Sequence, residues 1–160
     1  MMNKIFSIII LLISISSFSQ KIRSKEFSGI ITLSNGNPLV FELELKEKNG
    51  IVNGSSITGK GTIDETLSEI RGIYNKNTKT YKIKETKILS TSSEEDLNNF
   101  CYINMQISEI GKLSLKRHEG TFTGYFTNGE KCEDGKVILI EKEKLENKIE
   151  KVKKKIKKQK

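Results

Sequence analysis

The sequence predicts an all-β fold: an antiparallel up-and-down meander of about eight to ten strands that forms a barrel or half-barrel. Three observations indicate this fold. Between Glu26 and Ile140, apolar and polar residues alternate with a period of two, as in strands with one buried face. Gly and Asn-Gly turn signals interrupt the alternation about every eight to twelve residues. Helical periodicity is absent there and appears only after Glu141.

The first residues predict a secretory signal peptide that ends after Ser19. Lys4 precedes an apolar run over residues 5–15, and small Ser17 and Ser19 follow it. The run is shorter than the roughly twenty residues of a membrane-spanning helix, although an uncleaved anchor is the alternative. We therefore expect an exported protein, periplasmic or extracellular after cleavage, with a signal peptide (1–19), a barrel domain (20–141) and a Lys-rich helical tail (142–160).

The clearest strand covers residues 39–45, where every odd-numbered residue is Leu or Phe and two even-numbered residues are Glu. Asn35-Gly36-Asn37 before it and Asn49-Gly50 after it tolerate the positive φ of tight turns. Residues 89–99 form the one long polar loop that we expect. The other expected strands cover residues 26–34, 50–58, 67–75, 78–88, 100–110, 112–116, 120–128 and 135–141.

Four of these strands carry a Gly on the same face as large residues: Gly29, Gly54, Gly72 and Gly124. A Gly inside a strand removes packing, so its recurrence needs a reason. The favoured reason is a sheet that bends sharply in order to close. The alternative is that the glycines open a ligand cavity.

Several of these segments resemble small exported lipocalin-like (calycin-type) β-barrels of Gram-negative bacteria, which are mostly uncharacterised. The resemblance covers residues 26–141 and implies a closed barrel, but the chain has no Trp and lacks the Gly-x-Trp of true lipocalins. It therefore implies the architecture and no binding residues. The segments that carry it are Phe27-Ser28-Gly29, Gly50-Ile51-Val52-Asn53-Gly54-Ser55, Ile70-Arg71-Gly72-Ile73-Tyr74-Asn75, Phe100-Cys101, Gly120-Thr121-Phe122-Thr123-Gly124 and Cys132-Glu133-Asp134-Gly135-Lys136-Val137.

Cys101 and Cys132 are the two cysteines of the chain. An even count in an exported protein predicts a disulfide, which would join the start of a late strand to the turn over residues 128–135. The spacing is not Cys-x-x-Cys, so a redox pair is not expected.

The sequence carries no recognisable catalytic motif, and we expect a protein without enzymatic activity, cofactor or metal. His118, the single histidine, falls in the charged segment 116–120, which predicts a surface turn. Glu94-Glu95-Asp96 lacks the alternate spacing of a calcium loop and predicts a solvated loop.

Glu85 is ambiguous. Strict alternation places it on the inner face with Tyr81 and Ile83, where it would bind the polar head of a ligand or pair with Arg71. The favoured alternative is a bulge near Glu85, which would turn Thr86 and Ile88 inward and leave Glu85 in water.

Charge is concentrated in the tail. The formal net charge is +8, and residues 141–160 contain ten Lys and four Glu, so the body is close to neutral and nucleic acid is not an expected partner. Leu145, Ile149, Val152 and Ile156 form an amphipathic stripe. A solvated helix is the favoured interpretation, and docking to an anionic membrane, an envelope partner or the barrel is the alternative.

Two functions follow as hypotheses. The first is a lipocalin-like binder of a small apolar or lipid-like ligand. The second is a non-catalytic structural or interaction protein of the envelope, whose basic tail contacts an anionic surface or partner. For the first, we expect the ligand to lie among Phe27, Phe41, Tyr74, Tyr81, Glu85, Phe122 and Phe126.

Overall fold

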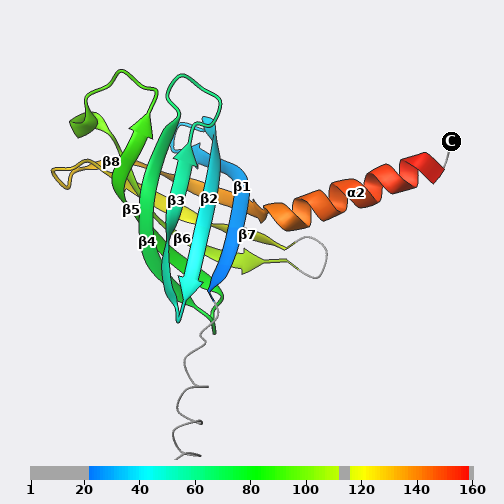
Figure 1. Cartoon of the computed structure of the whole chain (residues 1–160). Coiled ribbons are helices and arrows are strands. Elements are labelled where there is room, and N and C mark those ends of the chain that lie inside the picture. Colours follow the sequence, from blue (N-terminus) through cyan, green and yellow to red (C-terminus); the bar gives the residue numbers. More distant parts are fainter. Residues whose placement is uncertain (1–21, 112–115, 159–160) are drawn as a thin grey trace, which may run out of the picture.

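The structure, a computed structural model, describes residues 22–111 and 116–158. Its eight strands form a closed antiparallel barrel in which each strand pairs with its neighbours in the chain and β1 pairs with β8 (Figure 1). The strands are β1 (Arg23–Leu33), β2 (Pro38–Lys48), β3 (Ile51–Thr58), β4 (Thr66–Asn75), β5 (Thr80–Thr91), β6 (Tyr102–Ile110), β7 (Arg117–Tyr125) and β8 (Lys131–Glu141). A short 3-10 helix, η2 (Leu97–Asn99), precedes β6, and an α-helix, α2 (Lys142–Lys158), follows β8 directly.

The predicted all-β meander is confirmed, and the barrel is closed. The predicted signal peptide and the first four residues of the strand predicted over residues 112–116 lie outside the described residues, and Lys116 is not in a strand. Most strand boundaries differ from the prediction by one to four residues. The strand expected over residues 120–128 begins at Arg117 and ends at Tyr125, and the loop expected over residues 89–99 starts later, because β5 continues to Thr91.

The inward face of each strand supplies the core. On β2, Phe41, Leu43 and Leu45 are buried, whereas Val40 is 42% exposed, as the alternation predicts. Residues from all eight strands contribute to one continuous apolar cluster: Phe27, Ile31, Phe41, Leu43, Leu45, Val52, Ile70, Tyr81, Ile83, Ile103, Met105, Ile107, Phe122, Val137 and Leu139.

Glycines allow neighbouring strands to approach closely. A Cβ atom built at Gly29 would overlap the carbonyl oxygen of Ile138 on β8, and one built at Gly54 would overlap that of Glu44 on β2. The same holds at Gly72 against Lys82, on β4 and β5. These contacts are the geometry expected where a coiled sheet closes, so they support the first of the two reasons for the recurrent glycines.

The two cysteines form the predicted disulfide, with Cα atoms 6.0 Å apart. Cys101 immediately precedes β6, and Cys132 lies on β8 rather than in a turn, because β8 begins at Lys131. β7 runs between these two strands, and the bridge crosses it at Gly124, where an added Cβ would overlap Sγ of Cys101. The bridge therefore ties together β6 and β8 across the strand that separates them.

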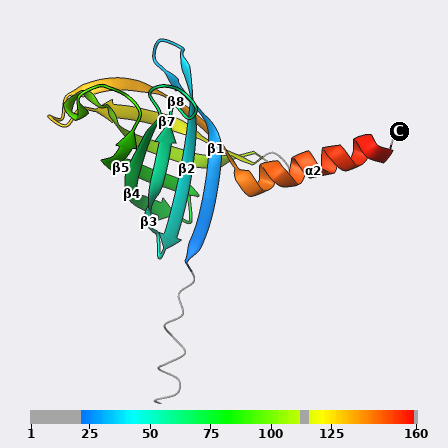
Figure 2. The same ribbon diagram turned by 45° about the horizontal axis from the view of Figure 1, so that its top comes forward.

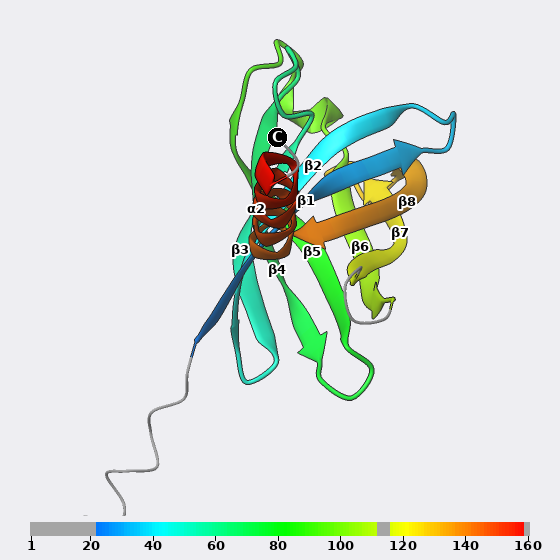
Figure 3. The same cartoon turned by 90° about the vertical axis from the view of Figure 1, so that its right-hand side faces the viewer.

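α2 projects away from the barrel. Figures 1 and 2 show it leaving the end of β8 as a free arm, and Figure 3 looks along its axis. Lys142 at its first residue lies 3.1 Å from a carboxylate oxygen of Glu42 and 3.7 Å from one of Glu26, so its base is fixed to β1 and β2. Beyond this base, Leu145 and Ile149 are 38% and 45% exposed.

Candidate functional site

Most of the residues expected to line an interior pocket are part of the packed core. Phe27, Phe41, Tyr81 and Phe122 are each at most 3% exposed and belong to the core cluster. Tyr74, half-buried, stacks on Tyr81 with ring centroids 4.4 Å apart. The rings of Phe27 and Tyr81 lie edge to face, with centroids 6.1 Å apart. Side chains therefore occupy the part of the interior where the ligand was expected.

Phe126 is half-buried and lies beyond the end of β7. It follows the end of β7, and its backbone N–H donates a hydrogen bond to the carbonyl oxygen of Glu130 at 2.8 Å, within the turn to β8. The prediction extended the strand to residue 128 and so placed Phe126 on the inner face. The strand ends earlier because this turn closes immediately after Tyr125.

A small opening lies beside Tyr74 and Tyr81. Arg23, Lys25, Leu45 and Glu47 complete its wall with the two tyrosines, and its volume is about 40 Å³. That volume accommodates a few water molecules, whereas sites for small organic ligands usually measure about 300–1,000 Å³. This opening is therefore too small for a lipid-like molecule.

Glu85 is buried in the interior, with 8% of its surface exposed. The hydroxyl of Ser56 on β3 donates to Oε1 at 2.6 Å, and the backbone N–H of Ile103 donates to Oε2 at 2.8 Å. Burial raises the pKa of the Glu85 carboxyl, and the bonds from Ser56 and Ile103 partly offset that rise. Both carboxylate oxygens are thus occupied by the protein itself.

The favoured prediction for Glu85, a bulge that leaves it in water, is wrong. The register does shift in this region, but it shifts after Glu85: Ile70 pairs with Glu85, Glu69 pairs with Lys87, and Thr86 is the extra residue. Thr86 is therefore exposed, and Glu85 keeps the inward direction of Tyr81 and Ile83.

Arg71, the partner considered for Glu85, lies on the outer face. Its Nε donates to Glu69 at 2.9 Å, on the same strand. Arg71 and Glu85 occupy opposite faces of the sheet because Arg71 pairs with Lys84, one position away from Glu85.

His118 is buried, with 2% of its surface exposed, so the prediction of a surface turn is wrong. It lies on β7 opposite Leu139 on β8. Its ring lies edge to face with that of Phe27, with centroids 4.8 Å apart. Burial, with a contribution from the positive charge of Lys25, lowers the pKa of His118 to about 4. The imidazole is therefore neutral at physiological pH, and its buried Nδ1 has no hydrogen-bond partner.

Both buried groups contact other residues of the interior. His118 packs among aromatic rings, and Glu85 is hydrogen-bonded to Ser56 at the junction of β3, β5 and β6. Within residues 22–111 and 116–158, no group of three or more His, Cys, Asp or Glu side chains is placed to hold a metal ion. Asp96, part of the acidic segment, instead caps η2 by accepting a hydrogen bond from the N–H of Asn98 at 2.8 Å.

The projecting helix is the remaining candidate site. Over Lys142–Lys158 the sequence contains nine Lys and three Glu. At 17 residues, the helix is about 25 Å long. In the described part of the chain, no helix is both long and apolar enough to cross a membrane.

Comparison with known proteins adds no functional assignment. No family model matches the chain, and no significant match was found among curated proteins or among solved structures.

Proposed function

We propose that this protein is an exported, non-catalytic interaction protein of the cell envelope, in which a filled barrel carries a basic amphipathic helix that binds an anionic lipid surface. The observation that carries the proposal is the projection of α2 from the barrel with Leu145 and Ile149 left uncovered. An unpaired apolar stripe on a charged helix is a feature of helices that lie in a membrane interface.

The sequence of α2 provides both components of interfacial binding. Positions 145, 149, 152 and 156 are apolar and fall within about 60° of arc at the 3.6 residues per turn of an α-helix. Lysines occupy most of the other positions. Each Lys near an anionic surface contributes about 1 kcal/mol, so the excess of Lys over Glu adds substantially to the burial of the apolar stripe.

The lipocalin-like carrier, which the sequence resemblance favours, receives less support. Its expected pocket residues Phe27, Phe41, Tyr81 and Phe122 are buried in the core cluster, and both oxygens of Glu85 already have partners. Native mass spectrometry of protein recovered from its source separates the two functions. A carrier would retain a small molecule that dissociates on unfolding, whereas the proposed interaction protein has the mass of the polypeptide alone.

Vesicle sedimentation tests the proposal. The full chain without residues 1–19 is mixed with vesicles of phosphatidylcholine, with or without one quarter phosphatidylglycerol. We expect binding only to the anionic vesicles, with loss of binding at high salt. The double variant Leu145→Gln/Ile149→Gln should bind at least about tenfold more weakly, since it removes apolar area from the stripe.

The matched control is Ile51→Gln/Ile63→Gln, which makes the same chemical change at two exposed residues of the barrel, 60% and 83% exposed. It should bind as the unchanged protein does. Equal weakening by the two double variants, equal binding to neutral vesicles, or no binding to anionic vesicles would each refute the proposal.

A further inference from the structure

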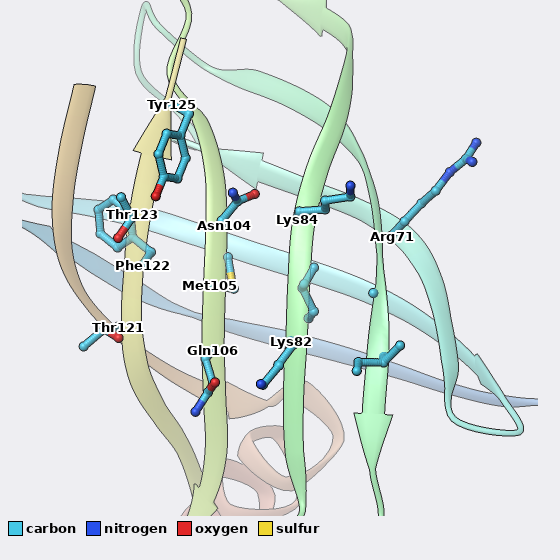
Figure 4. Close-up of a pocket in the computed structure, with 13 residues that line it drawn as sticks. Arg71, Lys82, Lys84, Asn104, Met105, Gln106, Thr121, Phe122, Thr123 and Tyr125 are labelled. Carbon is cyan, nitrogen blue, oxygen red and sulfur yellow. The ribbon is translucent and has the colours of Figure 1, made fainter. Parts of the chain in front are cut away.

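A shallow groove crosses the outer face of the barrel over β4, β5, β6 and β7 (Figure 4). Its volume is about 500 Å³, within the range of about 300–1,000 Å³ that is usual for small-molecule sites. It is open to solvent and lies on strands other than those that contact α2. The membrane proposal therefore does not account for it.

The strand register arranges the groove in two parallel rows. The first row pairs Ile73 with Lys82, Lys82 with Gln106, and Gln106 with Thr121. The second row lies two residues along each strand and comprises Arg71, Lys84, Asn104 and Thr123 in the same order. Figure 4 shows the amides of Asn104 and Gln106 on β6 between the lysines of β5 and the threonines of β7. The rows are about 7 Å apart, the repeat of a strand.

Two uncompensated positive charges lie in this groove. Many other lysines on the described surface have a carboxylate partner, such as Lys60 with Glu42 at 2.8 Å and Lys116 with Glu109 at 2.9 Å. Within the described residues, the ammonium groups of Lys82 and Lys84 have no ion pair or hydrogen bond, and both side chains are exposed. The positive charge of Arg71 is neutralised by Glu69. The groove thus favours a ligand with negative charge.

The other side chains favour hydroxyl groups. Asn104 and Gln106 each offer an amide donor and an amide acceptor, and neither has a partner within the described residues. Thr121 adds a hydroxyl, and the ring of Tyr125 stands at one end of the groove (Figure 4). Amides bind the hydroxyls of sugars as donor and acceptor together, and an aromatic ring packs against the C–H face of a sugar ring.

An extended peptide is less suited to this groove. A peptide that binds a sheet usually adds as a strand to an exposed edge. Here β5 pairs with β6 from Thr80 opposite Ser108 to Lys84 opposite Asn104, so neither strand offers an open edge over this stretch. Recognition must come from side chains.

We propose that this groove binds an acidic oligosaccharide, with Lys82 and Lys84 on its charged groups and with Asn104 and Gln106 on its hydroxyls. Amide chemical shifts of the ¹⁵N-labelled full chain without residues 1–19, titrated with trigalacturonate, test the proposal. We expect saturable shifts confined to β4–β7. The uncharged trimethyl ester of the same trisaccharide should bind at least about tenfold more weakly.

Two double variants that remove the same positive charge distinguish binding in the groove from general electrostatic attraction to the protein surface. Lys82→Gln/Lys84→Gln should weaken trigalacturonate binding at least about tenfold, whereas Lys48→Gln/Lys76→Gln, at exposed lysines outside the groove, should leave it within about twofold. Gln106→Ala should weaken it also. All of these side chains are exposed, so the fold should be retained.

Several outcomes would overturn the proposal. Equal weakening by the two lysine pairs would show a general charge effect, and equal binding of triglutamate would show that the sugar is not recognised. Equal binding of the ester would show that charge is not needed. Absence of binding up to about 10 mM trigalacturonate would exclude the site itself.

Discussion

The carboxylate of Glu85 accepts a hydrogen bond from the backbone N–H of Ile103 at 2.8 Å, where the ladder between β5 and β6 ends. The last paired residues are Lys84 and Asn104, and Glu85 with Ile103 would be the next pair. The side chain therefore takes the place of a backbone carbonyl. Through Ser56, the same carboxylate also reaches β3. Glu85 joins three strands through the interior, which gives a buried acid a structural role.

Glu85→Gln should stabilise the protein at neutral pH. A Gln can keep both bonds, by accepting from Ile103 and donating to Ser56, without a buried charge. Because burial raises the pKa of Glu85 in the folded state, its contribution favours folding most below the unfolded pKa and is lost as pH rises through the folded pKa. Urea unfolding at several pH values should therefore show a gain that disappears below about pH 4.

Glu85→Ala is the matched control for that variant. It leaves the buried N–H of Ile103 and the hydroxyl of Ser56 without an acceptor, so it should destabilise the protein by about 1–3 kcal/mol. If Glu85→Gln and Glu85→Ala lose the same stability at neutral pH, the carboxylate charge is required and our account of this residue fails.

The contribution of His118 to stability should depend on pH in the opposite direction to that of Glu85. Its pKa is lowered to about 4 by burial and by the charge of Lys25, against about 6.5 in an unfolded chain. The folded protein binds fewer protons between these values, so its contribution to stability is complete above pH 6.5 and is lost as pH falls through about 4. In the variant His118→Phe, this fall in the free energy of unfolding between about pH 6.5 and 4 should be absent, whatever the effect of the substitution on packing.

An NMR titration of the His118 ring checks the same prediction directly. The ring signals should move with a midpoint near pH 4 while the barrel remains folded. A midpoint near 6.5 would mean that the ring reaches solvent, and it would contradict the burial of His118 against Phe27.

The strands could be predicted from the sequence because one face of each is buried. Alternation is plain on β2, where Phe41, Leu43 and Leu45 point inward. It failed at His118, because the charged neighbours Arg117 and Glu119 lie on the outer face of the same strand and made the segment look like a turn. A strand is identified by its alternating residues, and a single polar residue on the inner face hides the pattern.

Details of packing could not be predicted in the same way. Whether Thr86 or a neighbour of Glu85 would be the bulged residue depends on the pairing of β4 with β5, which is not encoded in either strand alone. Whether the inner aromatic residues form a pocket or a core could not be predicted either. Aromatic residues such as Phe27 and Tyr81 suit a ligand pocket and a packed core equally, and only their mutual contact separates the two.

Removal of the disulfide should destabilise the barrel without changing its fold. Cys101 and Cys132 are separated by 31 positions, and closing a loop of this length contributes about 3–4 kcal/mol by restricting the unfolded chain. Cys101→Ser/Cys132→Ser should lower the free energy of unfolding by about that amount and keep a β-type circular dichroism spectrum. A loss of the spectrum would show that the bridge is needed for the fold itself.

Gly124→Ala should be costly because of that bridge. The new methyl group would overlap Sγ of Cys101, so we expect a loss of about 1–3 kcal/mol in the oxidised protein. In the background of Cys101→Ser/Cys132→Ser, the side chains are no longer joined and can turn aside. A double-mutant cycle should therefore show coupling, and additive losses would contradict it.

Deletion of α2 beyond its first turn should leave the barrel as stable as before. The base of the helix contacts β1, β2 and β8, where Lys142 meets Glu26 and Glu42 and Lys144 meets Glu141. These are partly exposed ion pairs, worth roughly 0–1 kcal/mol each, and a chain ending at residue 146 keeps them. Chemical unfolding of this shortened protein and of the full chain should give free energies that agree within about 0.5 kcal/mol, since the contacts at the base of the helix are retained. A larger loss would mean that the helix folds back onto the barrel in solution, and α2 would then not be free to bind a lipid surface.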